Sequence, residues 1–288
     1  MKADFWLDQI PLWGVFGLTA FAVFVAICIG TFLGLRRRRK PDYEGEASLG
    51  TIISATLGLV AFMLAFTFGI TAERFQARRQ LLLNEVNAIG TTYLRAGLLL
   101  EPHQSQVCKL LREYVDVRVN LARTSPHKQQ SMLKDVIARS ETLQDQMWSH
   151  AVLLARADRS SEIDALFINS LNEMIDLQTS RLTVLSYRIP PAIWYSLYFI
   201  TILSMVTVGY QVGLSGKSVL KLGVVLALTF SAVVFLISDL DRAGEGSLRV
   251  SQQPMFELQK KMQLSEDETG QGEKLGAFDS NSAATLKK

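Results

Sequence analysis

The distribution of charge along the chain constrains its fold more than any other feature. Charged residues make up 20% of the sequence, yet four long stretches contain none. These stretches are Leu12–Leu35, Ala47–Ala72, Ile189–Gly216 and Leu222–Ser238. The first three exceed the roughly 20 residues that a helix needs to cross a hydrocarbon core, and the fourth is near the lower limit of about 17. Because core helices of soluble proteins keep a polar face, we predict four transmembrane helices.

The first apolar stretch is not typical of a cleaved signal peptide. It is longer than the apolar region of such a peptide, and the basic run RRRRK at 36–40 stands where a small-residue cleavage site would be expected. We therefore expect a retained helix. The two cysteines, Cys28 and Cys108, are far apart and indicate neither a metal motif nor a disulfide framework.

The polar region between the second and third apolar stretches has the pattern of helices. Apolar residues recur every three, four or seven positions in four successive segments. These segments are Phe75–Tyr93, Val107–Leu121, Met132–Leu154 and Ile163–Val184. Four amphipathic helices with short connections favour a helical bundle.

Turn and cap residues predict where these helices begin and end. We expect Gly97 and Pro102 to end the first helix. Ser161, or its neighbour Ser160, is a plausible cap for the last one. His103 and His127 would then lie in loops beside prolines.

The predicted organisation has five parts. Residues 1–72 hold two membrane helices and a basic loop, and residues 73–188 form the bundle. Residues 189–240 hold the third and fourth membrane helices. Residues 241–264 form an amphipathic segment after the membrane, and the polar tail 265–288 is expected to be disordered.

The second membrane helix is expected to continue into the bundle. In AFTFGITAERFQARRQ, residues 65–80, an apolar half is followed by charged residues from Glu73 onward, with no proline between them. One helix would therefore leave the membrane and run directly into water. Such a helix can line a conduit on both sides of the interface, or transmit a domain motion to the membrane.

Basic residues in the short loops predict the orientation in the membrane. The run 36–40 lies in one short loop, and Lys217 and Lys221 lie in the other, on the same side. Because Lys and Arg in short loops favour the cytoplasmic side, the bundle is expected on the outer face. Six arginines near the opposite side count against this orientation, namely Arg74, Arg78, Arg79, Arg188, Arg242 and Arg249.

The sequence contains few features of an enzyme. Its three histidines, His103, His127 and His150, are dispersed, and it has no phosphate loop, nucleophile elbow or His-Glu-x-x-His motif. The four apolar stretches contain no ionisable Asp, Glu, Lys, Arg or His, which a membrane enzyme would need. Basic and acidic residues are mixed in 73–188, which argues against nucleic-acid binding. We predict no catalytic residue, no cofactor and no metal ligand.

The acidic group in DLDRAGE leaves two alternatives open. Asp239, Asp241 and Glu245 could bind a divalent cation loosely. Otherwise they form a charged end to the fourth membrane helix, with Arg242 pairing locally, which is the commoner role.

Two neighbouring stripes mark the second membrane helix on a helical wheel. The small stripe consists of Ser54, Gly58, Ala61, Ala65 and Gly69. The large stripe consists of Ile52, Leu59, Phe62, Phe66 and Ile70. Small residues let helices approach closely, so we predict helix packing along the first stripe. The large stripe is compatible with a pore lining or with ordinary packing.

Several motifs resemble those of the bacterial bestrophin-like family. They are the arginine run after the first membrane helix, EVNAIGTTYLR at 85–95, and DLDRA at 239–243, with Ala243 where proline is usual. The resemblance covers about residues 12–260. Three further segments resemble parts of bestrophins more distantly. They are the segment around Phe66 and Arg74, the RIPPAIWYSLY segment and the LISDLDRAGEGSLRVSQQP segment.

The resemblance implies a function. Bestrophins are pentameric ion channels whose second helix lines a narrow apolar neck with three bulky residues four apart. The resemblance places Phe62 and Phe66 at two of these positions and Gly58, which is not bulky, at the third. Residues 67–69 replace the Arg-Thr-Asn that follows the neck. It also implies a cytosolic bundle, opposite to the orientation predicted from the basic loops.

Our leading hypothesis is therefore a multi-pass protein of the bacterial cytoplasmic membrane that forms a homo-oligomeric channel for small ions. The alternative is a non-conducting scaffold or signalling protein whose helical bundle binds a partner. A pore requires the large stripe to face a symmetry axis, whereas a scaffold requires only packing.

Overall fold

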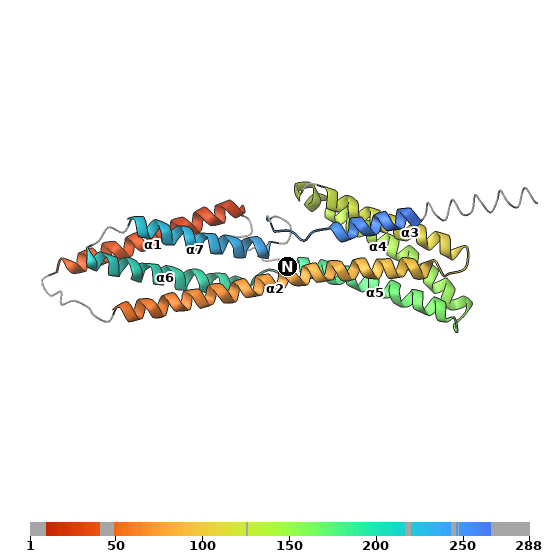
Figure 1. The fold of residues 1–288 in the computed structure, drawn as a ribbon, viewed down its shortest axis with the longest axis horizontal. Coiled ribbons are helices and arrows are strands. Elements are labelled where there is room, and N and C mark those ends of the chain that lie inside the picture. Colours follow the sequence, from red (N-terminus) through yellow and green to blue (C-terminus); the bar gives the residue numbers. More distant parts are fainter. Residues whose placement is uncertain are drawn as a thin grey trace, which may run out of the picture. The chain divides into compact units, whose positions relative to one another are not determined.

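The computed structural model describes residues 10–40, 49–124, 126–216, 220–242, 246 and 248–265. Every regular element in these ranges is a helix, which confirms the predicted all-α fold. The helices are α1 (Leu12–Arg38), α2 (Leu49–Ala96), α3 (His103–Arg123), α4 (Pro126–Ala157), α5 (Glu162–Leu185), α6 (Pro191–Ser215) and α7 (Leu220–Asp241), with a further C-terminal helix over 253–265 (Figure 1).

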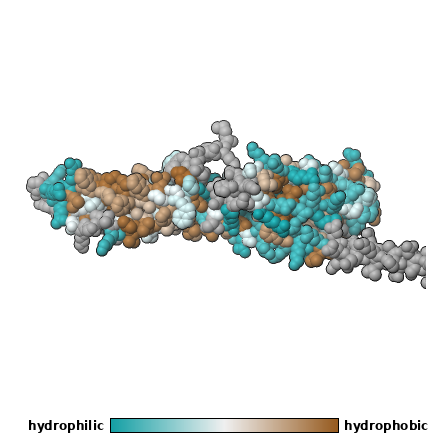
Figure 2. Space-filling view, turned by 90° about the horizontal axis from the view of Figure 1, so that it is seen from above, coloured by the Kyte–Doolittle hydropathy of each residue, from teal (hydrophilic) through white to brown (hydrophobic). Residues whose placement is uncertain are grey.

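The chain divides into two compact units, to both of which α2 contributes. The membrane unit is drawn from Met1–Ala77 and Ser186–Arg249, and the bundle unit from Arg78–Leu185 and Val250–Lys288. Within the described ranges, four helices are long and apolar enough to cross a membrane, as predicted: Leu12–Arg38, Gly50–Ala96, Pro191–Ser215 and Gly223–Asp241. Figure 2 shows apolar side chains covering much of the membrane unit's surface, whereas the bundle unit is largely hydrophilic.

Glycines hold α1 close to α6 in the membrane unit. A Cβ built on Gly213 of α6 would lie 3.0 Å from the Cα of Gly34 in α1. One turn earlier, a Cβ on Gly209 would overlap the carbonyl oxygen of Ile27. Only glycine permits backbones to approach this closely. The sequence analysis did not predict this contact, although Gly30 and Gly34 lie four residues apart in α1, as Gly209 and Gly213 do in α6.

Helix α2 is continuous over 48 residues, which confirms the prediction that one helix runs from the second apolar stretch into the polar region. Its first half carries a buried seam of residues spaced seven or four apart, namely Ile53, Val60, Thr67 and Thr71. The seam continues in the bundle unit with Leu82 and Ile89. The same side of the helix is therefore buried within each unit.

The bundle unit has a single apolar core. It is formed by large side chains from α2 to α5 and the C-terminal helix, among them Leu82, Ile89, Leu111, Tyr114, Leu143, Met147, Phe167, Leu171, Met174 and Met255. The C-terminal helix also buries Met262 in this core. The predicted tail 265–288 lies outside the described residues except for Ser265, which is helical.

Two predicted loop positions are wrong. His103 is the first residue of α3, and His127 lies in the first turn of α4. Proline opens both helices, with Pro102 just before α3 and Pro126 as the first residue of α4. Because the first N–H groups of a helix have no partner within it, proline fits there and does not have to end a helix.

The predicted cap of the last bundle helix is confirmed. The Ser161 hydroxyl oxygen accepts a hydrogen bond of 3.2 Å from the backbone N–H of Asp164, just inside α5. This satisfies one of the free donors at the start of the helix.

Candidate functional site

The small stripe of α2 is uncovered within one chain. Ser54, Gly58, Ala61, Ala65 and Gly69 are all exposed. A Cβ built on Gly58 or Gly69 would have no neighbouring atom within 4 Å. The predicted packing along this stripe therefore requires a second chain, and it stays a prediction.

The two predicted constriction residues share this exposed face. The relative exposure of Phe62 is 64% and that of Phe66 is 52%. Their rings are stacked, with centroids 6.3 Å apart and planes inclined by 15°. Ile52 and Leu59 of the large stripe are also exposed, at 52% and 47%. The face is apolar and continuous, but a single copy of it cannot enclose a passage.

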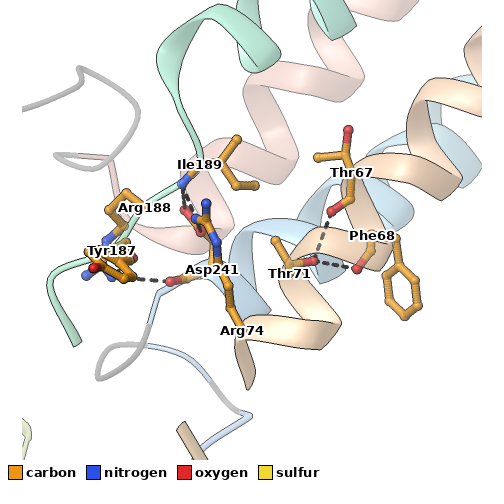
Figure 3. Close-up of polar contacts among 8 residues, drawn as sticks. All are labelled: Thr67, Phe68, Thr71, Arg74, Tyr187, Arg188, Ile189 and Asp241. Atoms are coloured by element: carbon orange, nitrogen blue, oxygen red, sulfur yellow. Dashed lines mark hydrogen bonds and ion pairs between the residues drawn. The ribbon is translucent and has the colours of Figure 1, made fainter. Parts of the chain in front are cut away.

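Threonines on the buried side of α2 bond back to their own helix. The Thr71 hydroxyl donates to the carbonyl oxygens of Thr67, at 3.3 Å, and Phe68, at 2.9 Å (Figure 3). The Thr67 hydroxyl donates to the carbonyl oxygen of Met63 at 2.7 Å. Both threonines are fully buried. They therefore add no polar group to the face that carries the phenylalanines.

Asp241 joins α7 to α2 and to the segment before α6 in the membrane unit. It is the last residue of α7 and is 3% exposed. Its carboxylate accepts the backbone N–H of Ile189, at 3.1 and 3.3 Å, and lies 3.4 Å from Nη1 of Arg74 on α2. Arg188 donates to the carbonyl oxygen of Asp241 at 3.3 Å (Figure 3). The carboxylate thus fixes the end of α7 to α2 and to the segment that begins α6.

These contacts support the helix-ending role for the acidic group. Arg242 donates to the carbonyl oxygen of Ile10 at 2.7 Å, so it also ties this end of the unit to the chain before α1. Asp239 is buried as well, at 1% exposure, whereas Glu245 lies outside the described residues. Among the residues that the structure describes, no group of three or more His, Cys, Asp or Glu side chains could hold a metal ion.

A buried ionic network lies in the bundle unit. Glu85 of α2 is fully buried and pairs with Arg118 of α3, at 2.6 Å, and with Arg181 of α5. Tyr114 donates to Glu85 at 3.3 Å and to Gln178 at 2.5 Å. Burial is the main cause that raises the pKa of Tyr114, so its hydroxyl stays protonated and remains a donor. The network connects α2, α3 and α5 through one carboxylate.

The sequence analysis did not find this network. Glu85 belongs to the EVNAIGTTYLR motif, and it lies three residues after Leu82 and four before Ile89 on the buried side of α2. A charged residue among the apolar positions of that seam was the one sign in the sequence that a buried ion pair lies there. Its partners Arg118 and Arg181 lie 33 and 96 residues away, and helical periodicity cannot pair residues so far apart.

Four apolar spans, with a helical bundle inserted between the second and third, define an all-α multi-pass membrane protein. The sequence profile of the bestrophin-like domain matches residues 17–255. The chain therefore belongs to the bestrophin-like family. No curated protein sequence matches the chain.

Solved structures support the same fold. A bacterial bestrophin homologue from Klebsiella pneumoniae superimposes with a TM-score of 0.58 at 14% identity, covering 84% of this chain and 96% of the homologue. A point variant of a Klebsiella pneumoniae bestrophin homologue gives a TM-score of 0.61 at 15% identity, covering 87% and 98%. At such low identity the likeness shows the fold alone.

Proposed function

We propose that the protein is a homo-oligomeric ion channel whose apolar constriction is lined by Phe62 and Phe66. The observation that carries the proposal is the exposed face of α2, on which the stacked phenylalanines lie beside a stripe of small residues. Copies of this face arranged around an axis would form rings of aromatic side chains. The bestrophin-like family supports such an assembly, with the pentamer as the expected stoichiometry.

The small residues distinguish this face from a surface that only contacts lipid. On α1 and α6 most exposed membrane positions carry large side chains, such as Phe21 and Phe199 at 67% and 68% exposure. Lipid chains fit such positions without requiring small residues. The exposed small stripe on α2 is instead suited to close contact with another helix.

The mechanism needs no covalent chemistry. A narrow apolar ring holds water poorly, so an ion that passes must lose part of its hydration shell. The barrier is therefore set by the width of the ring and by its lack of polar groups. Gly58, one turn before Phe62, would leave the passage wider at that level than a bulky residue would.

Two measurements on the purified protein test this function. Native mass spectrometry in detergent gives the number of chains, and flux assays in liposomes show whether ions cross. We expect an oligomer and an ion flux above that of empty liposomes. A monomer, or an oligomer without flux, would contradict the channel and favour a scaffold whose bundle binds a partner.

We also propose that the protein lies in the bacterial cytoplasmic membrane with its bundle unit on the outer face. Arg36, Arg38 and Arg39 at the end of α1 are exposed, as a basic cytoplasmic loop would be. Of the six arginines that oppose this orientation, Arg74 pairs with the carboxylate of Asp241, and Arg188 donates to the backbone carbonyl oxygen of the same residue. The charge of Arg74 is thus partly neutralised within the unit.

Reporter fusions test the orientation. A reporter that is active only in the cytoplasm should be silent when fused after His150 and active when inserted within 36–46. The reverse pattern would place the bundle in the cytoplasm, as in bestrophins, without affecting the channel proposal.

A further inference from the structure

Two histidines that are distant in the sequence meet in the bundle unit. His103 is the first residue of α3, and His150 lies near the end of α4. Their Nδ1 atoms are 2.9 Å apart. The ring centroids are 5.2 Å apart, and the planes are inclined by 80°. Both side chains are half-buried, so the pair is held by the bundle yet open to small solutes.

The separation of the two nitrogens suits a shared metal ion. Zinc binds histidine nitrogen at about 2.0–2.1 Å, so two nitrogens on one tetrahedral zinc lie roughly 3.3 Å apart. On a square-planar or octahedral centre with similar bond lengths, neighbouring nitrogens lie roughly 2.9 Å apart. The rings therefore need only a small movement to accept an ion. A proton shared between the rings explains the same distance when no metal is bound.

The side chains of the pair are of a type that binds transition metals. A neutral imidazole offers a nitrogen lone pair, which is the form that binds metals. Imidazole nitrogen suits Zn²⁺, Ni²⁺ and Cu²⁺, whereas Ca²⁺ and Mg²⁺ prefer oxygen ligands.

There is open space beside His150 for the rest of a coordination shell. An open surface pocket of ≈ 430 Å³ is lined by His150, but not by His103, and by side chains of α3 and α4 that include Gln106, Gln146 and Ser149. Water molecules in such a pocket have partners to hold them. A metal ion bound by two protein nitrogens can therefore complete its shell with water.

We propose that His103 and His150 form a binding site for a transition-metal ion of the Zn²⁺ class, with water as the remaining ligands. The described residues bring together no set of three ligand side chains, so the ion is held by two protein ligands and exchanges readily. It would tie the start of α3 to the end of α4. The proposal replaces the prediction of no metal ligand, and it does not depend on ion conduction.

Thermal unfolding of the full chain, purified without a histidine tag, tests the site. We expect ZnCl₂ to raise Tm of the wild type, because an ion that binds only the folded state stabilises it. EDTA should reverse the shift, and MgCl₂ should produce none. His103→Asn and His150→Asn should each abolish the shift. His127→Asn is the matched control and should retain it, because this third histidine lies at the other end of α4.

A second measurement uses only the wild type, so it does not depend on whether the variants fold. Electron paramagnetic resonance of the wild type with one equivalent of Cu²⁺ should show splitting from two equivalent nitrogens. Equal Zn²⁺ shifts in the wild type and in both histidine variants would show that the metal binds elsewhere. A wild type without a Zn²⁺ shift and without nitrogen splitting would show that the pair is a hydrogen bond only. Either outcome overturns the proposal.

Discussion

Single residues with buried charge organise each unit. In the membrane unit Asp241 accepts a backbone N–H of the segment before α6 and pairs with Arg74 of α2. In the bundle unit Glu85 lies between Arg118 and Arg181. A buried charge is tolerated when it is paired and hydrogen-bonded, and removing one partner leaves the others uncompensated. We therefore expect the loss of either residue to destabilise its unit, although neither lies on the exposed face of α2.

Replacement of Glu85 tests this role. Glu85→Gln should lower the free energy of unfolding by about 3–5 kcal/mol, because two arginines lose their buried carboxylate. The measurement is chemical or thermal unfolding of the purified protein.

Glu113→Gln is the matched control for this measurement. Glu113 pairs with Arg139, and side-chain exposures of 40% and 47% place this pair at the surface. An exposed pair contributes at most about 1 kcal/mol. Equal losses in the two variants would contradict the assigned role of Glu85.

At the scale of the elements, α1 and α6 approach each other closely, and glycines make this contact possible. The sequence analysis sought close packing on α2 because small residues form a stripe there. The contact between the glycines of α1 and those of α6 was not predicted, because a helical wheel describes one helix and not its neighbours. By contrast, the continuity of α2 could be predicted, because the change from apolar to charged residues contains no helix-breaking proline.

A change at Gly209 tests the contact between α1 and α6. Gly209→Ala should destabilise the membrane unit by about 1–3 kcal/mol, because the added Cβ would overlap the carbonyl oxygen of Ile27 and force the helices apart. Gly17→Ala is the control, since a Cβ on Gly17 of α1 meets nothing within 4 Å. Thermal unfolding monitored by size-exclusion chromatography would compare the two. A Gly209 variant as stable as the control would rule out a tight contact.

A change at Gly58 tests the small stripe of α2. Gly58→Leu adds a side chain where one chain has open space, so the fold of the single chain should persist. The oligomer should dissociate, because the added bulk separates helices that pack along the stripe. Native mass spectrometry measures the oligomer, with Gly17→Leu on α1 as the control. An intact Gly58→Leu oligomer would show that the stripe is not an interface between chains.

On the scale of the whole molecule, the order of the helices could be predicted from the sequence, but the contacts between them could not. Charge-free stretches and helical periods predicted four spans and an inserted bundle, because these features depend on neighbouring residues. The His103–His150 pair and the Glu85–Arg181 pair join residues that are 47 and 96 positions apart in the sequence. The family profile and two solved structures at 14% and 15% identity support the fold, but they leave the role of the exposed α2 face to experiment.

Ion flux through liposomes containing Phe62→Ala, Phe66→Ala and the double variant tests the central claim most directly. Because both rings are more than half exposed in one chain, their truncation should cost the fold little. The account predicts a wider passage and a flux above wild type, greatest in the double variant. Phe199→Ala, equally exposed on α6, should conduct like the wild type. Flux no higher than that of empty liposomes in the wild type and in every variant would contradict a channel lined by α2.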